Sequence, residues 1–255
     1  MNYLQQLLIL CPIVFFSGFV DSIAGGGGII SLPAYHAVGL SPHMVLGTNK
    51  LSACIGCFTS TFRFLKNKSY NKKILPSVIF ALLGSALGSR IAVYVSSQFL
   101  KYVLIIALPI LAVFMLLKKD FSDNERYQKH STIKLFMLCV LVAFVVGMYD
   151  GFFGPGTGTF LILLYTSVVG FSLKESLGNA KIINLSTNFA AVVVFMYHGH
   201  VDYKLAVPAA LAAILGNYIG SGLAIKNGKK IVRPMLVVVL TLLLGKIIYD
   251  LAVLP

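Results

Sequence analysis

Apolar runs long enough, or nearly long enough, to cross a lipid bilayer recur along this chain of 255 residues. About 20 apolar residues span a bilayer as an α-helix. Hydrophobic residues make up 58% of the sequence and charged residues 11%, against about 25% charged in ordinary soluble domains. The sequence therefore predicts an all-α polytopic membrane protein. The runs are 4–20, 46–65, 74–95, 102–117, 133–149, 160–171, 182–197, 205–225 and 231–253.

The net charge of +13 is concentrated between these runs. Three connections hold most of the basic residues: Arg63, Lys66, Lys68, Lys72 and Lys73; Lys118, Lys119, Arg126, Lys129 and Lys134; and Lys226, Lys229, Lys230 and Arg233. None has the interleaved aromatic residues that base stacking needs, so we expect no nucleic-acid partner. Basic loops of this kind face the cytoplasm. Counting crossings places all three loops in the cytoplasm and both termini outside.

Two stretches of the chain match each other in order. "GFVDSIAGGGG" at 18–28 matches "GMYDGFFGPGTG" at 147–158, which pairs Asp21 with Asp150, and "GTNK" at 47–50 matches "GNAK" at 178–181. The register predicts two five-segment repeats, 1–117 and 135–255, joined by a basic cytoplasmic linker at 118–134. The match also makes the first run a retained span, and no basic residue precedes it as in a signal peptide.

An odd number of crossings per repeat predicts that the second repeat is inverted relative to the first. Each repeat begins with a long helix, a glycine-rich break and a short helix, which at 27–39 covers only about 20 Å and is a re-entrant or half helix. Ser41-Pro42 and the capping box at Ser172 mark the start of the next helix in each repeat. Inverted repeats with broken helices are typical of secondary transporters.

Two lysines occupy matching places inside predicted spans. Lys50 and Lys181 each lie nine residues after their cap, roughly 13 Å along a helix and near the bilayer centre. An ionisable residue at this depth indicates a functional site. Inversion would bring both lysines to one central site, beside further polar groups on the same two helices. These are Thr48, Asn49, Asn184 and Asn188.

Cations, amides and helix N-termini at the breaks together favour an anionic ligand. The predicted backbone cradle comprises Gly25, Gly26, Gly27, Gly28, Gly154, Gly156, Thr157 and Gly158. Two other interpretations stay open. Each lysine could pair with Asp21 or Asp150 as structural glue, or these aspartates could centre a cation site and carry a coupling proton or Na⁺. Arg90 is a weaker candidate, expected at an entry vestibule.

Other motifs favour ordinary structural roles. "CIGC" at 54–57 has the spacing of a metal or redox pair but is more typical of small residues on a packed helix face. His198, His200 and Asp202 are more typical of a solvated turn than of a metal site. The pairs Gly84/Gly88 and Gly216/Gly220 indicate close helix packing.

No catalytic constellation is visible in the sequence. "GPGTG" at 154–158 is not a phosphate loop, because Gly-Lys-Ser/Thr does not follow it. We therefore expect no enzyme, no cofactor and no metal.

"DSIAGGGGIISLPAYHAVGLSP" at 21–42 and "LGTNKLSACIGCFTSTFRF" at 46–64 resemble the TauE/SafE, or sulfite exporter, family, in its YfcA-like branch. The resemblance covers essentially the whole chain. It implies a multi-pass permease of the bacterial inner membrane. It also implies a substrate among sulfite, sulfonates, related organosulfur compounds and other small organic anions.

The leading hypothesis is a secondary transporter that moves a small anion across the cytoplasmic membrane by alternating access. Its partners would be the substrate, the bilayer, a coupling proton or Na⁺ and, as a candidate assembly, a second copy of the chain. The alternatives are a passive anion channel and a membrane assembly subunit without transport.

Overall fold

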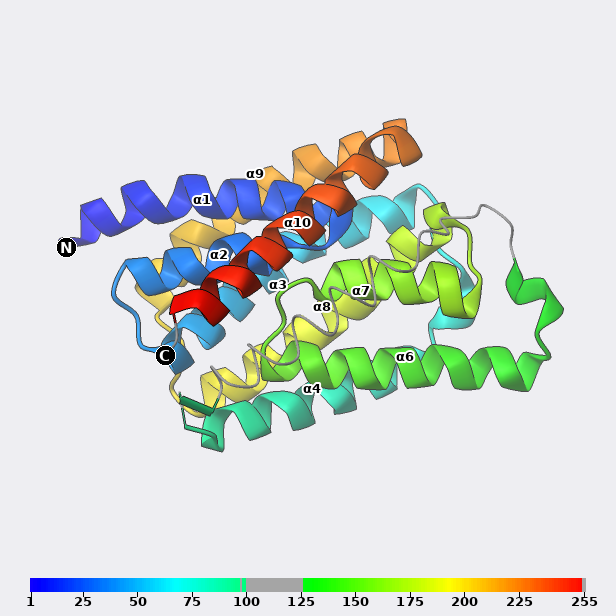
Figure 1. Cartoon of the computed structure of the whole chain (residues 1–255), viewed down its shortest axis with the longest axis horizontal. Helices are drawn as coiled ribbons and strands as arrows, with labels where there is room; N and C mark the ends of the chain where they lie inside the picture. The colour runs from blue at the N-terminus through cyan, green and yellow to red at the C-terminus, as the bar shows by residue number, and fades with distance from the viewer. Residues whose placement is uncertain (97, 100–125, 254–255) are drawn as a thin grey trace.

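The computed structural model describes residues 1–96, 98–99 and 126–253, and every regular element in these residues is helical (Figure 1). The predicted run 102–117 lies outside them. The long and short helices are α1 (Tyr3–Ala24), α2 (Gly27–Ala37), α3 (Pro42–Lys66), α4 (Ser77–Tyr94), α6 (Thr132–Phe152), α7 (Thr157–Leu164), α8 (Leu173–Tyr197), α9 (Tyr203–Asn227) and α10 (Lys229–Val253). Single turns are η1 (Lys72–Ile74), η2 (Arg126–Lys129) and the π turn η3 (Tyr165–Val169).

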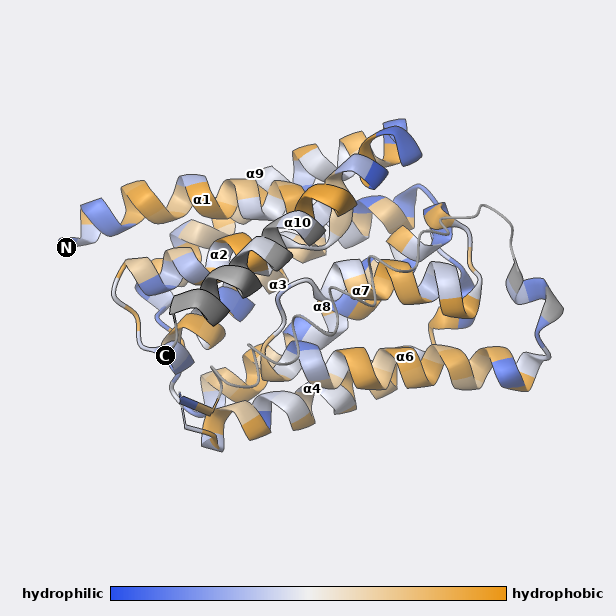
Figure 2. Ribbon diagram, viewed as in Figure 1, coloured by the Kyte–Doolittle hydropathy of each residue, from blue (hydrophilic) through white to orange (hydrophobic). Residues whose placement is uncertain are grey.

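Five described helices are long and apolar enough to cross a membrane: α1, α4, α6, α8 and α9. Their outward residues are hydrophobic, as Figure 2 shows along α1 and α6. Large apolar side chains such as Leu8, Ile79 and Leu141 are exposed on the surface of the bundle. Their exposure would be unfavourable in water and is favourable in contact with lipid. The prediction of an all-α, multi-pass membrane protein is confirmed.

Local signals set where the helices begin. Ser41 precedes Pro42 at the first position of α3. Proline fits there because the first N–H groups of a helix have no intrahelical acceptor, so its missing N–H costs no hydrogen bond. Ser172 and Glu175 form the predicted capping box of α8, each binding the backbone N–H of the other. The short second helix ends at Ala37, two residues before the predicted end, because Gly39 turns the chain with φ +96°.

Helices of the two halves pack against each other, parallel between α1 and α9 and between α4 and α6, and antiparallel between α3 and α8. α1 lies along α9, α4 lies along α6, and α3 and α8 pack together in the middle. In Figure 1, α1 runs from left to right and α6 from right to left. The later helices of the two halves also run in opposite directions, α3 against α8 and α4 against α9. The directions support an inverted repeat, which stays a prediction. The described parts of all three basic loops lie at the right-hand end, opposite the N-terminus.

Glycines allow the closest of these helix contacts. A Cβ on Gly84 or Gly88 would collide with the α6 backbone, and one on Gly216 or Gly220 with the α1 backbone. Small residues spaced four apart let two helix backbones approach in this way. The predicted packing role of both glycine pairs is confirmed, and it appears at the equivalent contact in each half.

Candidate functional site

The two glycine-rich breaks meet at the centre of the molecule. Gly25 ends α1 with φ +81°, a left-handed conformation that favours glycine. Its backbone packs against Gly158 at the start of α7, where a Cβ on either residue would overlap the other's backbone. Gly28 lies against Pro155 in the same contact. Glycine is therefore needed here first for the close approach of two broken helices.

Two buried ion pairs bridge the halves next to this contact. Lys181 on α8 reaches Asp21 on α1, with 2.7 Å between Nζ and Oδ2, and also donates to the Asp21 backbone carbonyl. Lys50 on α3 reaches Asp150 on α6, with 2.8 Å between Nζ and Oδ2. Each lysine thus pairs with the aspartate of the other half. Breaking either pair would leave an uncompensated charge in the interior.

The surroundings of the two aspartates differ. Asp150 is 2% exposed, and its Oδ1 accepts a hydrogen bond from the Thr157 hydroxyl at 2.7 Å. The Asp21 side chain retains 19% exposure. The Lys50 and Lys181 side chains are 4% and 1% exposed. Asp21 is therefore the member of the two pairs that solvent or a ligand reaches most easily.

A cavity of about 50 Å³ lies between the breaks and the middle helices. This is room for a few water molecules or one small ion. Its lining brings together twelve predicted site residues: Asp21, Gly25, Gly27, Gly28, Asn49, Lys50, Asp150, Gly154, Thr157, Gly158, Asn184 and Asn188. Polar side chains from α1, α3, α6 and α8 thus converge on one small space.

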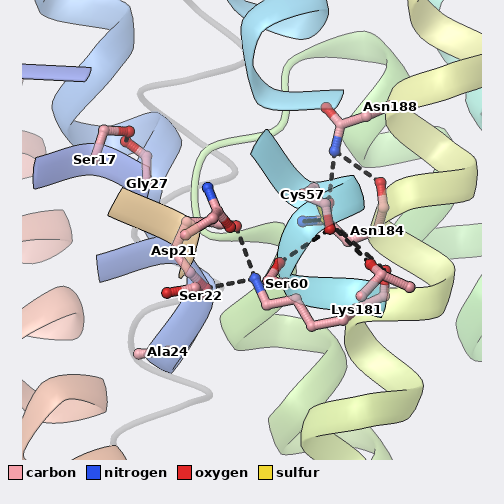
Figure 3. A network of polar contacts seen from close by, with 12 residues as sticks. Ser17, Asp21, Ser22, Ala24, Gly27, Cys57, Ser60, Lys181, Asn184 and Asn188 are labelled. Atoms are coloured by element: carbon pink, nitrogen blue, oxygen red, sulfur yellow. Dashed lines mark hydrogen bonds and ion pairs between the residues drawn. The ribbon is translucent and has the colours of Figure 1, made fainter. Parts of the chain in front are cut away.

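The remaining predicted site residues lie elsewhere. Lys181 is behind the lining, held by Asp21 (Figure 3). Thr48 is fully buried, and its hydroxyl oxygen accepts from the Asp202 N–H at 3.0 Å. Gly26 faces the Val239 side chain, Gly156 is the left-handed N-cap of α7, and Arg90 is exposed on α4.

Amide side chains continue the polar network from the lysine. Asn188 donates to the Asn184 backbone carbonyl at 2.7 Å and to its side-chain oxygen at 2.9 Å, and the Asn184 amide reaches the Cys57 sulfur at 4.0 Å (Figure 3). On the facing side, the Ser31 hydroxyl donates to the Asn49 side-chain oxygen at 2.6 Å. These contacts orient the amides that face the cavity.

The polar lining residues missed from the sequence include Ser17, Ser31 and Asn217. Helical spacing could have indicated the first two, since Ser17 lies four residues before Asp21 and Ser31 four after Gly27. Asn217 lies inside the Gly216/Gly220 motif, which from the sequence indicates only helix packing, so that Asn217 did not stand out as a site residue. Its amide donates to the Ala213 carbonyl at 3.0 Å, while its Oδ1 has no partner among the described residues.

The cysteine motif at 54–57 and the histidines near residue 200 make packing contacts rather than a second site. Cys57 is buried between α3 and α8, with its sulfur 3.7 Å from the Thr61 hydroxyl. His200 stacks on His43 with ring centroids 5.2 Å apart. Within the residues that the structure describes, no three His, Cys, Asp or Glu side chains are placed to hold a metal ion.

Comparison with known proteins agrees with this architecture. The family model "Sulfite exporter TauE/SafE" matches residues 10–247. The chain belongs to the TauE/SafE family. It is 35% identical to a "Probable membrane transporter protein" of Haemophilus influenzae, with 97% of this chain and 96% of the relative covered. It is 34% identical to the "Probable membrane transporter protein ORF9" of Sinorhizobium sp, with 96% and 93% covered.

A third TauE/SafE relative is "Probable membrane transporter protein YfcA" of Escherichia coli K12, which is 32% identical with 95% of this chain and 91% of the relative covered. No solved structure matches the chain. The family and these relatives are membrane transporters rather than enzymes. This chain is accordingly a multi-pass membrane transporter of the TauE/SafE family.

Proposed function

We propose that this TauE/SafE protein is a secondary transporter that moves a small anion across the cytoplasmic membrane by alternating access. The observation that carries the proposal is the polar cavity where two helix breaks and two buried, crossed lysine–aspartate pairs meet. Ionisable groups at membrane depth are costly and mark substrate or ion pathways. Broken helices that point their N-termini at a central site are a transporter device for binding anionic groups.

The donors around the cavity suit an oxyanion. Lys50 supplies a positive charge, Asn49 supplies an amide, and α2 and α7 begin at the lining residues Gly27 and Thr157. Helix N-termini carry partial positive charge and N–H donors. The cavity suits a compact anion such as sulfite, and a bulkier sulfonate requires the helices to separate. The family description, sulfite exporter, supports the same class of ligand.

The ion pairs also suggest how transport is coupled. Both lysines are already neutralised by aspartates, so an added anion would leave excess negative charge in a poorly solvated space. A proton on Asp21 or Asp150, or a bound Na⁺, restores the balance. Asp21 is the more accessible of the two and the better entry point for the coupling ion. We therefore propose that the anion and the coupling ion share one site.

The proposed orientation places the basic loops in the cytoplasm and the termini outside. All described basic loops lie at one end of the helix bundle (Figure 1), and loops rich in Lys and Arg stay cytoplasmic. Single cysteines at Lys68 and Lys229, labelled with an impermeant reagent in oriented vesicles, test this. Labelling from opposite faces would break the inverted-repeat arrangement.

Flux into proteoliposomes, with radiolabelled sulfite, sulfonates and carboxylates, tests the function. We expect saturable uptake driven by a proton or Na⁺ gradient, and strong loss in Lys50→Ala and Lys181→Ala. Wild-type rates in both variants would refute the central-anion model. Flux without ion coupling or saturation would identify a passive channel. A folded protein with no flux of any probe would identify an assembly subunit.

A further inference from the structure

Two turns at opposite ends of the bundle have the same backbone structure. One follows α3 at 67–71 and the other follows α8 at 198–202. Each contains a residue with positive φ, Lys68 at +49° and Gly199 at +72°. Each closes with a hydrogen bond across five residues: Ser69 N–H to the Phe64 carbonyl at 3.0 Å, and His200 N–H to the Phe195 carbonyl at 2.9 Å. This is the Schellman pattern of a helix C-terminus.

Each turn packs against a glycine on a long helix of the other half, and we call this glycine the seat of the turn. The His200 carbonyl lies against Gly47 on α3, and the Ser69 carbonyl lies against Gly178 on α8. A Cβ on either glycine would collide with that carbonyl oxygen. The seat is tight because the colliding atom would be backbone, which cannot move without displacing the whole turn.

The residue after each glycine holds the seated turn with a hydrogen bond. The Thr48 hydroxyl oxygen accepts from the Asp202 N–H at 3.0 Å, and the Asn179 side-chain oxygen accepts from the Asn71 N–H at 2.9 Å. Thr48 and Asn179 are both fully buried. Because a buried acceptor that loses its donor pays its full desolvation penalty, each bond favours the docked turn.

Each seat is joined to the central site through the same helix. Lys50 lies three residues after Gly47, and Lys181 three residues after Gly178, about 4.5 Å further along a rigid helix. A shift of α3 that takes Lys50 out of its pair with Asp150 therefore moves the seat under the turn 198–202. The same holds for Lys181 and the turn 67–71.

We propose that the turns 67–71 and 198–202 are the two gates of the transporter, and that Asn179 and Thr48 are the positioning residues that hold them closed. This inference rests on the proposed transport function. The turn 67–71 lies at the end with the basic loops, and 198–202 at the end with the N-terminus (Figure 1). Each gate is thus closed by a helix of the opposite half.

The two gates differ in their additional contacts. At 67–71, the Asn71 amide also donates to the Glu175 carboxylate at 2.8 Å. At 198–202, the added contacts are the stacking of His200 on His43 and the edge-on contact of His198 with Tyr94. A hydrogen bond to a charged acceptor is stronger than one between neutral groups. The gate at the basic end thus has a charge-assisted hydrogen bond that the other gate replaces with ring contacts.

Cysteine accessibility in oriented membrane vesicles tests the proposal. Ala53 lines the cavity and is replaced by cysteine as a reporter, in a chain whose four native cysteines are replaced and which keeps the elution profile of the folded protein. Thr48→Val removes one acceptor and Asn179→Leu the other. Thr48→Ser and Asn179→Asp, which keep an acceptor oxygen, are the matched controls.

We expect Thr48→Val to raise labelling by an impermeant thiol reagent from the face that carries the N-terminus. We expect Asn179→Leu to raise it from the opposite face. Loss of one hydrogen bond predicts a change of roughly 3- to 10-fold in each case. The controls should stay within a factor of about two of the parent.

Equal labelling in all variants, or a rise from the same face in both, would overturn the gate assignment. If either variant fails to fold, as judged by its elution profile, Gly47→Ala and Gly178→Ala provide a second way to unseat the same turns. Opposite labelling changes in a protein that carries no anion would support the gates and refute the transport function. Transport in variants that show no labelling change would support the transport function and refute the gates.

Discussion

Lys50 on α3 and Asp150 on α6 form an ion pair with 2.8 Å between Nζ and Oδ2, and their side chains are only 4% and 3% exposed. Its counterpart joins Lys181 to Asp21 at 2.7 Å. The structural-glue interpretation expects such pairs, and so does a transport site whose lysines are neutralised between cycles. Substitutions that separate stability from transport distinguish these two roles.

Neutralising one partner of the buried pair should destabilise the protein far more than neutralising both. Lys50→Met leaves the Asp150 carboxylate without its cation, which costs about 3–5 kcal/mol for buried pairs. The double variant Lys50→Met/Asp150→Asn should recover most of the melting temperature in detergent but not the flux. Full transport by the double variant would show that the pair serves only the fold.

Gly158→Ala should disrupt folding although alanine is the better helix former. Its Cβ would overlap the Gly25 backbone, and overpacking of this kind costs about 1–3 kcal/mol. Gly245→Ala in α10 is the control, because the described residues leave its added Cβ without a neighbour within 4 Å. The control should be neutral or more stable by about 1 kcal/mol. Equal melting temperatures for both variants would contradict the close approach of the two breaks.

Asn217 should favour substrates that carry a hydroxyl group as well as a negative charge. Its buried Oδ1 has no donor among the described residues, and leaving such an acceptor unpaired costs about 1–3 kcal/mol. We expect glycolate to be taken up in preference to acetate, and Asn217→Leu to abolish the preference. Asn188→Leu, at the same cavity, should lower both rates and keep their ratio. An unchanged ratio of glycolate to acetate uptake in Asn217→Leu would contradict a role of Asn217 in selecting the hydroxyl group.

The turn 198–202 should loosen as the pH falls. Burial, the neighbouring His43 and then His198 lower the pKa of His200 below its ordinary value. The unfolded chain therefore binds this proton first, so stability is present at neutral pH and is lost as the pH falls through about 6.5 and below. Melting temperatures between pH 7.5 and 5.5 measure the loss. In His200→Gln this part of the slope should disappear, and an identical slope would rule out His200 as its source.

The elements of this fold follow from local chemistry. Apolar runs predict the membrane helices because helix length and hydropathy are properties of a segment. Ser41-Pro42 and the capping box at Ser172 predict helix starts because a cap involves only its own first turn. The matching motifs at 47–50 and 178–181 indicated that Lys50 and Lys181 would lie at related depths, and both are buried beside one site.

The tertiary structure alone decided which of these residues face the ligand space. Neighbours on a helix point about 100° apart, so Asn49 lines the cavity while Thr48 holds a turn of the other half. The sequence by itself determined the helices, their breaks and the depth of the charges, since these depend on residues close together in the chain. The crossed ion pairs, the contact of Gly25 with Gly158 and the seating of the two turns depend on how the halves pack, which no local pattern encodes.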